Sequence, residues 1–376
     1  MRVNVGLLIV RGLAASVVLA LLLAANSAAA PASGAGLAPA LQKDVKALVA
    51  EGVPGVVVLV RREGRTVQLA GGYSNLEKKT PMRVGDRFRI GSVTKSFVAT
   101  VVLQLVGEGK LSLDDSIEEW LPGVVPNGDN ITIRQLLSHQ SGLFDYLNDE
   151  RVLKPYLSGN LSHVWTPPKL VAVSTSHPAV FAPGAKVSYS NTNYIVLGLI
   201  VEAATKDTMK AQLRKRIFGP LGLRSTVLAT SQGIAGAHAH GYLVQGKNQL
   251  QDVTLVSPSY AWSAGAIVST ASDIARFYRA LLGGRLLRPE LLQAMKTTTD
   301  RVGLGLYQTP SFCGRPDLWG HDGALAAYLT LAFNSEDGKR QFVILVNSLT
   351  FNDQVGSKRA QQALGRLFKA AAGCGT

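Results

Sequence analysis

The chain has 376 residues, of which 47% are hydrophobic and 17% charged. These proportions are typical of a globular protein with a large core, and they exclude a disordered or collagen-like chain. There are 39 Lys and Arg residues against 25 Asp and Glu, a formal net charge of +14. A protein this basic is attracted to anionic polymers and membrane surfaces. No basic run is interleaved with aromatic residues, so we predict no nucleic-acid partner.

Residues 1–30 have the pattern of a secretory signal peptide. Arg2 and Arg11 precede an apolar run from Gly12 to Ala25, and small residues follow it. The run is short for a helix that crosses a membrane, which needs about 20 apolar residues. We therefore predict that residues 1–30 direct export, and that the protein is secreted rather than anchored in a membrane.

The N-terminal part of the mature chain predicts one helix and a β-hairpin. Apolar residues recur at helical spacing over Leu41–Val49. Residues 55–72 read GVVVLVRREGRTVQLAGG, which is two β-rich runs around a turn at 62–64. A further short strand is expected at Phe88–Ile90.

Farther along, helical patterns come first and strand patterns return after them. ITIRQLLSHQSG (131–142) and YIVLGLIVEAAT (194–205) each have an apolar face and predict helices. Strand character returns in SAGAIVST (263–270) and in AAYLTLAFNSEDGKRQFVILVNS (326–348). The last segment predicts a hairpin that turns at Asp337-Gly338.

Strands at both ends with helices between them indicate an α/β (α+β) fold in two lobes. We expect a sheet lobe built from residues 31–91 and 264–376, closed by an amphipathic helix at Gln361–Ala371. A mainly helical lobe, residues 92–263, is expected to be inserted between its two parts.

Ser92 and Lys95 form the only Ser-x-x-Lys of the chain, at the start of an apolar helical run. Residues three apart share one face of a helix, with Cβ atoms about 5–6 Å apart. The apolar residues that follow predict burial, which lowers the pKa of a lysine and lets it accept the proton of a serine hydroxyl. The alternative is an N-cap serine beside an exposed lysine.

Tyr189 and Asn191 are a second pair of candidates, in an extended stretch that follows a Pro-Gly turn and precedes the helix at 194–205. A phenol can relay a proton to a leaving group, and an amide can orient a substrate peptide. Tyr146 and Asn148 have the same spacing. They lack the Pro-Gly turn and the apolar helix, so we favour the later pair.

His321, Asp322 and Gly323 are expected where a strand begins. A glycine at that position lets a substrate backbone come close to the strand edge.

Cys313 and Cys374 are the only cysteines. In an oxidising compartment they most simply form one disulfide, and two free buried thiols are the alternative. His238 and His240 have no third ligand nearby in the sequence, so we predict no metal site and no cofactor.

Ser-x-x-Lys, Tyr-x-Asn and His-x-Gly, in this order, resemble the class C β-lactamase and serine DD-peptidase family. The resemblance is closest to the secreted D-alanyl-D-alanine carboxypeptidases. It covers nearly the whole mature chain, including GSVTKSF, LLSHQSGL, YSNTNY, SAGA and both cysteines.

The resemblance implies an antiparallel sheet flanked by helices, with the active site between this lobe and a helical one. It implies that Ser92 is acylated, that Lys95 and Tyr189 transfer protons, and that the N–H groups of Ser92 and Ala324 form an oxyanion hole. The residues expected to bind substrate are Asn191, His321, Asp322, Gly323 and Ala324.

Two departures put carboxypeptidase specificity in doubt. The close relatives have His-Thr-Gly-Thr in the third motif, where this chain has Asp322 and Ala324. An arginine that they place before the first cysteine is absent, with Tyr307 near its position. An ionised Asp322 would repel the terminal carboxylate of a substrate.

The sequence thus favours a secreted serine hydrolase that forms an acyl-enzyme, with D-Ala-D-Ala peptides of the cell wall as the default substrate. The alternatives on the same scaffold are an esterase, a D-aminopeptidase or amidase, and a β-lactamase. A catalytically silent wall-binding protein and a Ser-His-Asp hydrolase are alternatives of other classes, but the nearest match to Gly-x-Ser-x-Gly, AWSAG, begins with Ala261. We expect a monomer that binds small peptides or peptidoglycan stems, and β-lactams.

Overall fold

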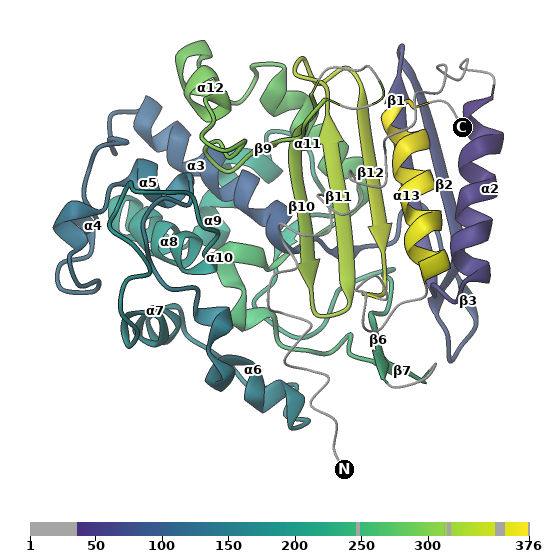
Figure 1. The fold of residues 1–376 in the computed structure, drawn as a ribbon, viewed down its shortest axis with the longest axis horizontal. Coiled ribbons are helices and arrows are strands. Elements are labelled where there is room, and N and C mark those ends of the chain that lie inside the picture. The colour runs from purple at the N-terminus through teal and green to yellow at the C-terminus, as the bar shows by residue number, and fades with distance from the viewer. Residues whose placement is uncertain (1–35, 246–248, 312, 314–316, 350–357, 375–376) are drawn as a thin grey trace.

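The computed structural model describes residues 36–245, 249–311, 313, 317–349 and 358–374 (Figure 1). The predicted signal peptide, residues 1–30, lies outside these ranges. Among the described helices, none is long and apolar enough to cross a membrane.

A seven-stranded antiparallel sheet forms one side of the molecule, with the strand order β3-β2-β1-β12-β11-β10-β9. Both ends of the chain contribute, because β1 pairs with β12. The two predicted hairpins are confirmed as β1–β2 and β11–β12. The strands are β1 Gly55–Arg62, β2 Arg65–Asn75, β3 Thr80–Pro81, β9 Tyr307–Gln308, β10 Trp319–Leu325, β11 Tyr328–Asn334 and β12 Gln341–Val346.

Helices cover both faces of this sheet. On one face, α2 (Leu37–Ala50) and α13 (Lys358–Ala372) lie side by side (Figure 1). On the other face, α11 (Ala271–Leu282) packs against the central strands. Strand β1 shows why both layers form: alternate residues of GVVVLV enter two different apolar clusters, so neither face is exposed to water.

Most of the remaining helices lie on the other side of the molecule from α2 and α13 (Figure 1). Helix α3 is at their centre, and its first ten residues are all buried. The bounds are α3 Thr94–Gly107, α4 Ile117–Trp120, α5 Ile133–Leu137, α6 Glu150–Leu157, α7 Pro167–Thr175, α8 Asn191–Thr205, α9 Met209–Leu213, α10 Trp262–Gly265 and α12 Pro289–Lys296. Short strands accompany them: β4 Phe88–Arg89, β5 Val227–Leu228, β6 Tyr242–Gln245, β7 Gln249–Asp252 and β8 Ile267–Ser269.

Five local predictions need correction. In the strand expected over residues 263–270, only Ile267–Ser269 is a strand, because Trp262–Gly265 forms α10. Asn191 is the first residue of α8 and does not lie in an extended stretch before it. The helix expected over residues 131–142 ends at Leu137, and His139 has a φ of 58°, a left-handed conformation that a helix cannot continue through. Ser92 lies in a 3₁₀ turn, Gly91–Val93, rather than in the first turn of the α-helix. Strand β10 begins at Trp319, so His321 lies inside the strand and not where it begins.

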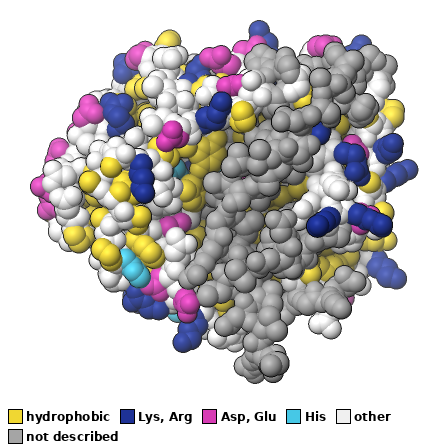
Figure 2. All heavy atoms as spheres, in the orientation of Figure 1, with side chains coloured by type: hydrophobic (Ala, Val, Ile, Leu, Met, Phe, Trp, Pro, Cys, Tyr) yellow, Lys and Arg dark blue, Asp and Glu magenta, His cyan; other side chains and the backbone are white. Residues whose placement is uncertain are grey.

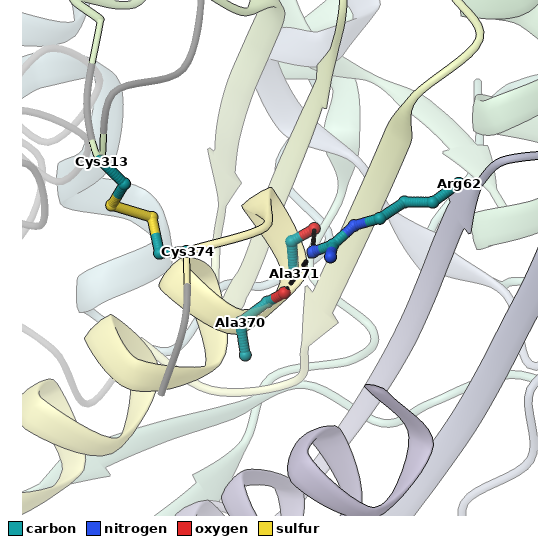
Figure 3. The surroundings of a disulfide bond; sticks show 5 residues. All are labelled: Arg62, Cys313, Ala370, Ala371 and Cys374. Atoms are coloured by element: carbon teal, nitrogen blue, oxygen red, sulfur yellow. Dashed lines mark hydrogen bonds between the residues drawn. A yellow bond between two sulfur atoms is a disulfide. The ribbon is translucent and has the colours of Figure 1, made fainter. Parts of the chain in front are cut away.

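The disulfide between Cys313 and Cys374 is present, with a Cα–Cα distance of 5.6 Å (Figure 3). It ties the chain that precedes β10 to the end of α13. Arg62, at the end of β1, donates hydrogen bonds of 2.5 and 2.9 Å to the carbonyl groups of Ala370 and Ala371. A cation is favourable at this end of a helix, where carbonyl groups lack partners within the helix.

Lysine and arginine side chains gather on the side where α2 and α13 lie (Figure 2). Lys358, Arg359 and Arg366 are exposed on α13, opposite its buried apolar face. Arg366 also lies 3.5 Å from the buried carboxylate of Asp44 on α2. These three basic residues therefore belong to the solvent-exposed face of α13.

Candidate active site

Ser92 is held against strand β10 by two glycines. Gly91 has a φ of 54°, and a Cβ atom there would lie 2.6 Å from the backbone nitrogen of Ala324. On the opposite side, a Cβ atom on Gly323 would lie 2.9 Å from the backbone nitrogen of Ser92. Side chains at these positions would force the two backbones apart. The glycines therefore bring the N–H groups expected to form the oxyanion hole to the same place.

Lys95 is completely buried one turn after Ser92, on α3. Its Nζ atom donates to Ser92 Oγ at 3.0 Å, to Asn191 Oδ1 at 2.8 Å and to the carbonyl oxygen of Ala264 at 2.7 Å. Burial lowers the pKa of Lys95 to about 7, although the carboxylates of Asp145 and Asp322 oppose the shift. A substantial neutral fraction is therefore present near neutral pH.

These three partners fix the direction of the amine. A neutral amine has two N–H groups and one lone pair. The carbonyl oxygens of Ala264 and Asn191 can only accept, so they take the two N–H groups. The lone pair then points at the hydroxyl of Ser92, which is the geometry that a base needs in order to remove its proton.

Tyr189 contacts the same hydroxyl from the other side. Its Oη atom lies 2.7 Å from Ser92 Oγ and 3.3 Å from Asn191 Oδ1, and its single O–H group can donate to either oxygen. Burial raises the pKa of Tyr189 well above its ordinary value, and the hydrogen bond with Ser92 only partly offsets this. The side chain is therefore a neutral phenol, which can donate a proton.

The pair Tyr146 and Asn148 is not at this site. Tyr146 is buried and donates from Oη to the carbonyl of Tyr260 at 2.6 Å, while Asn148 is exposed. The residue just before them does reach the site: Asp145 Oδ2 accepts from Asn191 Nδ2 at 2.9 Å. Asp145 was missed in the sequence because it lies 46 positions from Asn191 and belongs to no motif that we recognised.

Strand β10 presents its residues to two different faces. Paired residues of antiparallel strands point to the same side. Gly323 pairs with Thr330, and a Cβ atom on Gly323 would point toward Ser92. His321 is two residues before Gly323 on the strand, so its side chain lies on the same face. Asp322 pairs with Leu331, which belongs to the apolar cluster under α2 and α13.

His321 is a buried, neutral imidazole. Its Nδ1–H group donates to the carbonyl of Asp322, and its ring lies 4.4 Å from the ring of Tyr307, centroid to centroid. Burial, aided by the charge of Lys95, lowers the pKa of His321 to about 3. Tyr307, on β9, therefore lies beside the site.

Asp322, whose ionised form would repel a substrate carboxylate, is buried. Its residue is only 2% exposed, and Oδ1 has no hydrogen-bond partner. Burial raises the pKa of Asp322 to about 7. Its Oδ1 atom is 3.7 Å from Nδ1 of His321. The carboxyl group therefore remains close to His321, although the Asp322 side chain leaves β10 on the face opposite to Ser92.

His139 supports Tyr189 from behind. Its ring centroid lies 4.5 Å from that of Tyr189, and its Nδ1 accepts from the backbone N–H of Ser190 at 3.2 Å. Burial lowers the pKa of His139 well below its ordinary value. It thus acts as a neutral packing residue near the end of α5.

His238 and His240 stack at 5.3 Å, and His240 Nδ1 lies 2.6 Å from Asp252 Oδ2. Within the part of the chain that the structure describes, no group of three or more His, Cys, Asp or Glu side chains is arranged to hold a metal ion.

Comparison with known proteins places the chain in one family. The family model described as Beta-lactamase matches residues 41–366. Among curated proteins, the D-aminopeptidase of Brucella anthropi is 30% identical over 333 residues, which cover 83% of this chain and 59% of that protein. The chain therefore spans less than two thirds of the length of this relative.

Solved structures give closer agreement over the full length. A D-stereospecific amidohydrolase from Streptomyces sp. has a TM-score of 0.80 at 35% identity, over 90% of this chain and 99% of that one. The D-amino acid amidase of Ochrobactrum anthropi SV3, in complex with L-phenylalanine amide, has a TM-score of 0.77 at 30% identity, over 89% and 98% of the two chains.

Proposed function

The chain belongs to the β-lactamase family of serine hydrolases, and we propose that it hydrolyses amides through an acyl-enzyme on Ser92. The observation that carries this proposal is the hydrogen bonding of Lys95, which directs the lone pair of its neutral form at the serine hydroxyl. A catalytically silent wall-binding protein would have no need for this arrangement.

In the proposed acylation step, Ser92 Oγ attacks the carbonyl carbon of the substrate and its proton passes to Lys95 Nζ. The N–H groups of Ser92 and Ala324 stabilise the oxyanion of the tetrahedral intermediate. Tyr189 donates its proton to the departing amine as the C–N bond breaks, and Lys95 returns a proton to Tyr189. Water then attacks the ester on Ser92, and the same groups transfer its protons in reverse order.

We propose that the leaving group is neutral, such as ammonia or an amine, and that the acyl group is a D-amino acid. The D-aminopeptidase and amidase relatives support the acyl group. For the leaving group, a substrate ending in a carboxylate is bound most strongly by a cation. Lys95 already has three partners, and the other charged groups that act on its pKa are the carboxylates of Asp145 and Asp322. D-Alanyl-D-alanine carboxypeptidase activity, the default from the sequence, is the competing specificity.

Steady-state kinetics with four substrates tests this proposal: D-alaninamide, L-alaninamide, a D-alanine ester and an acylated peptide ending in D-Ala-D-Ala. We expect kcat/KM for D-alaninamide to exceed that for the L-enantiomer and for the peptide by at least ~10-fold. A preference for the peptide would establish the carboxypeptidase instead, and a preference for the ester over the amide would establish an esterase. Activity that survives in Ser92→Ala would remove the proposed mechanism.

We also propose that the protein is exported and monomeric. The disulfide supports export, since such bonds persist in oxidising compartments. Fractionation of the producing cells tests the location, and light scattering of the purified protein tests the monomer. Recovery of the protein with residues 1–30 attached, inside the cell, would contradict export.

A further inference from the structure

We propose that Asp145 is a positioning residue for proton transfer: its carboxylate holds the side-chain amide of Asn191 in the orientation that presents Oδ1 to Lys95. The inference rests on the proposed function, because this orientation matters only if Lys95 takes the proton of Ser92. Asp145 lies just before the 3₁₀ turn Tyr146–Asn148 and does not itself touch Ser92 in any described contact.

Both oxygens of the Asp145 carboxylate are engaged. Oδ2 accepts from Asn191 Nδ2 at 2.9 Å, and Oδ1 accepts from the backbone N–H of Leu147 at 3.1 Å. A carboxylate can only accept hydrogen bonds, so the NH₂ group of Asn191 must face it. The carbonyl oxygen of the same amide then faces Lys95, where it accepts at 2.8 Å.

The opposite amide orientation would redirect the base. With the amide flipped, the NH₂ group of Asn191 would face Lys95 Nζ. The lone pair of the neutral amine would then accept from Asn191, and an N–H group of the amine would point at Ser92 Oγ. In that arrangement Lys95 cannot take the proton of the serine. The orientation of the Asn191 amide therefore decides whether neutral Lys95 can accept the proton of Ser92.

Asp145 is needed most at the moment when the base is neutral. A protonated Lys95 has only N–H groups to offer and would by itself attract Oδ1 of Asn191. Once it loses a proton, its nitrogen can accept as well as donate, and it no longer selects either orientation of the amide. The hydrogen bond between Asn191 and Asp145 does not involve Lys95 itself, so it is available to hold the amide in place when Lys95 is neutral.

The carboxylate also acts on Lys95 through its charge. The charges of Asp145 and Asp322 both raise the pKa of Lys95. The other titratable groups that face it are His139, Tyr189, Tyr194 and His321. Burial lowers the pKa of both histidines and raises that of both tyrosines, so these four remain neutral near pH 7. Removing the charge of Asp145 should therefore lower the pKa of Lys95.

Covalent labelling by a fluorophosphonate, followed by intact mass, tests the proposal without a known substrate. The key variant is Asp145→Ser, because a serine still accepts from the N–H of Leu147 but is too short to reach Asn191. We expect labelling to slow ~10- to 100-fold, the usual effect of misplacing a reacting group. In the Asn191→Ala background, Asp145→Ser should cause no further loss, because the amide that it orients is gone.

Asp149→Asn is the matched control. Asp149 accepts from the backbone N–H two residues ahead, as Asp145 does, but it pairs with Arg151 and His177 and not with the site. Its labelling rate should equal that of the wild type. If Asp145→Ser does not fold, Asp145→Asn takes its place. Its single carbonyl oxygen can serve only one of the two donors, and the midpoint of its rate–pH curve should move to lower pH.

The outcomes are separable. Labelling of Asp145→Ser within a factor of two of the wild type, or losses that multiply with Asn191→Ala, would overturn the positioning role alone. So would an Asp145→Asn enzyme with an unchanged rate and midpoint. Absence of label in the wild type, or label that persists in Ser92→Ala, would instead overturn the proposed function.

Discussion

The two sides of the candidate site are built differently. On the helical side, Ser92, Lys95, Tyr189, Asn191 and Asp145 form one continuous hydrogen-bonded network. On the sheet side, β10 offers backbone N–H groups, a neutral imidazole and a buried carboxyl oxygen that lacks a partner. A fully bonded network holds reacting atoms in fixed geometry. The helical side thus holds its polar groups in fixed positions, whereas the sheet side leaves one buried carboxyl oxygen without a partner.

The largest effect is expected on the helical side, from Lys95→Ala. This change removes the base, so turnover should fall as far as it does in Ser92→Ala. The two residues act in one step, and the double variant should be no slower than either single one. Kinetics of all three variants on the best substrate test this. A double variant much slower than both would show that the two residues act independently.

The dependence of turnover on pH should follow the base. Since the pKa of Lys95 is about 7 and the neutral form is active, kcat/KM should rise ~10-fold per pH unit below that value and level off above it. Asp322 has a pKa in the same range. The rising limb should therefore persist in Asp322→Asn. If the rise of kcat/KM with pH disappeared in that variant, the titrating group would be Asp322 and not Lys95.

Asp322 should affect stability more than rate. Its pKa is about 7 in the folded protein, against an ordinary value of 3.8, so the folded state binds the proton more tightly than the unfolded one. Wild-type stability should fall relative to Asp322→Asn as pH rises from about 4 to about 7, by on the order of 3 kcal/mol. Denaturant titrations of both proteins at pH 4.5 and pH 8 measure this difference. A constant difference would mean that the carboxyl group is not desolvated.

The smallest effect on turnover is expected from removal of the disulfide, which lies away from both sides of the site. Replacing Cys313 and Cys374 by alanine should lower stability by about 4 kcal/mol in the chain-entropy model. Rates at a temperature where the variant remains folded should not change, because no described contact links the bridge to Ser92. Thermal melts and initial rates of the two proteins give both quantities. An equal Tm would show that the bridge does not constrain the unfolded chain.

The helical side was the more predictable from the sequence. Ser92 and Lys95 are three positions apart, and Tyr189 and Asn191 are two apart, so local spacing places each pair. Both hairpins were also predictable, because Gly64 and Gly338 have the positive φ that their turns need.

What could not be predicted depends on tertiary packing. The contact of Asp145 with Asn191 joins segments 46 positions apart. The burial of Asp322 follows from the register of β10 against β11, which no local pattern reveals. Helix α5 ends early where the chain approaches His139, whose positive φ is uncommon for any residue other than glycine and is not indicated by the apolar pattern.

The most direct test of the central claim is peptide mapping of the protein after incubation with a fluorophosphonate. Fluoride leaves when the serine oxygen attacks phosphorus, and the phosphonyl group stays attached to that oxygen, so the adduct survives digestion. We predict one adduct, on the peptide that contains Ser92, and none in Ser92→Ala. An adduct on any other residue, or one that persists in Ser92→Ala, would contradict the assignment of Ser92 as the nucleophile.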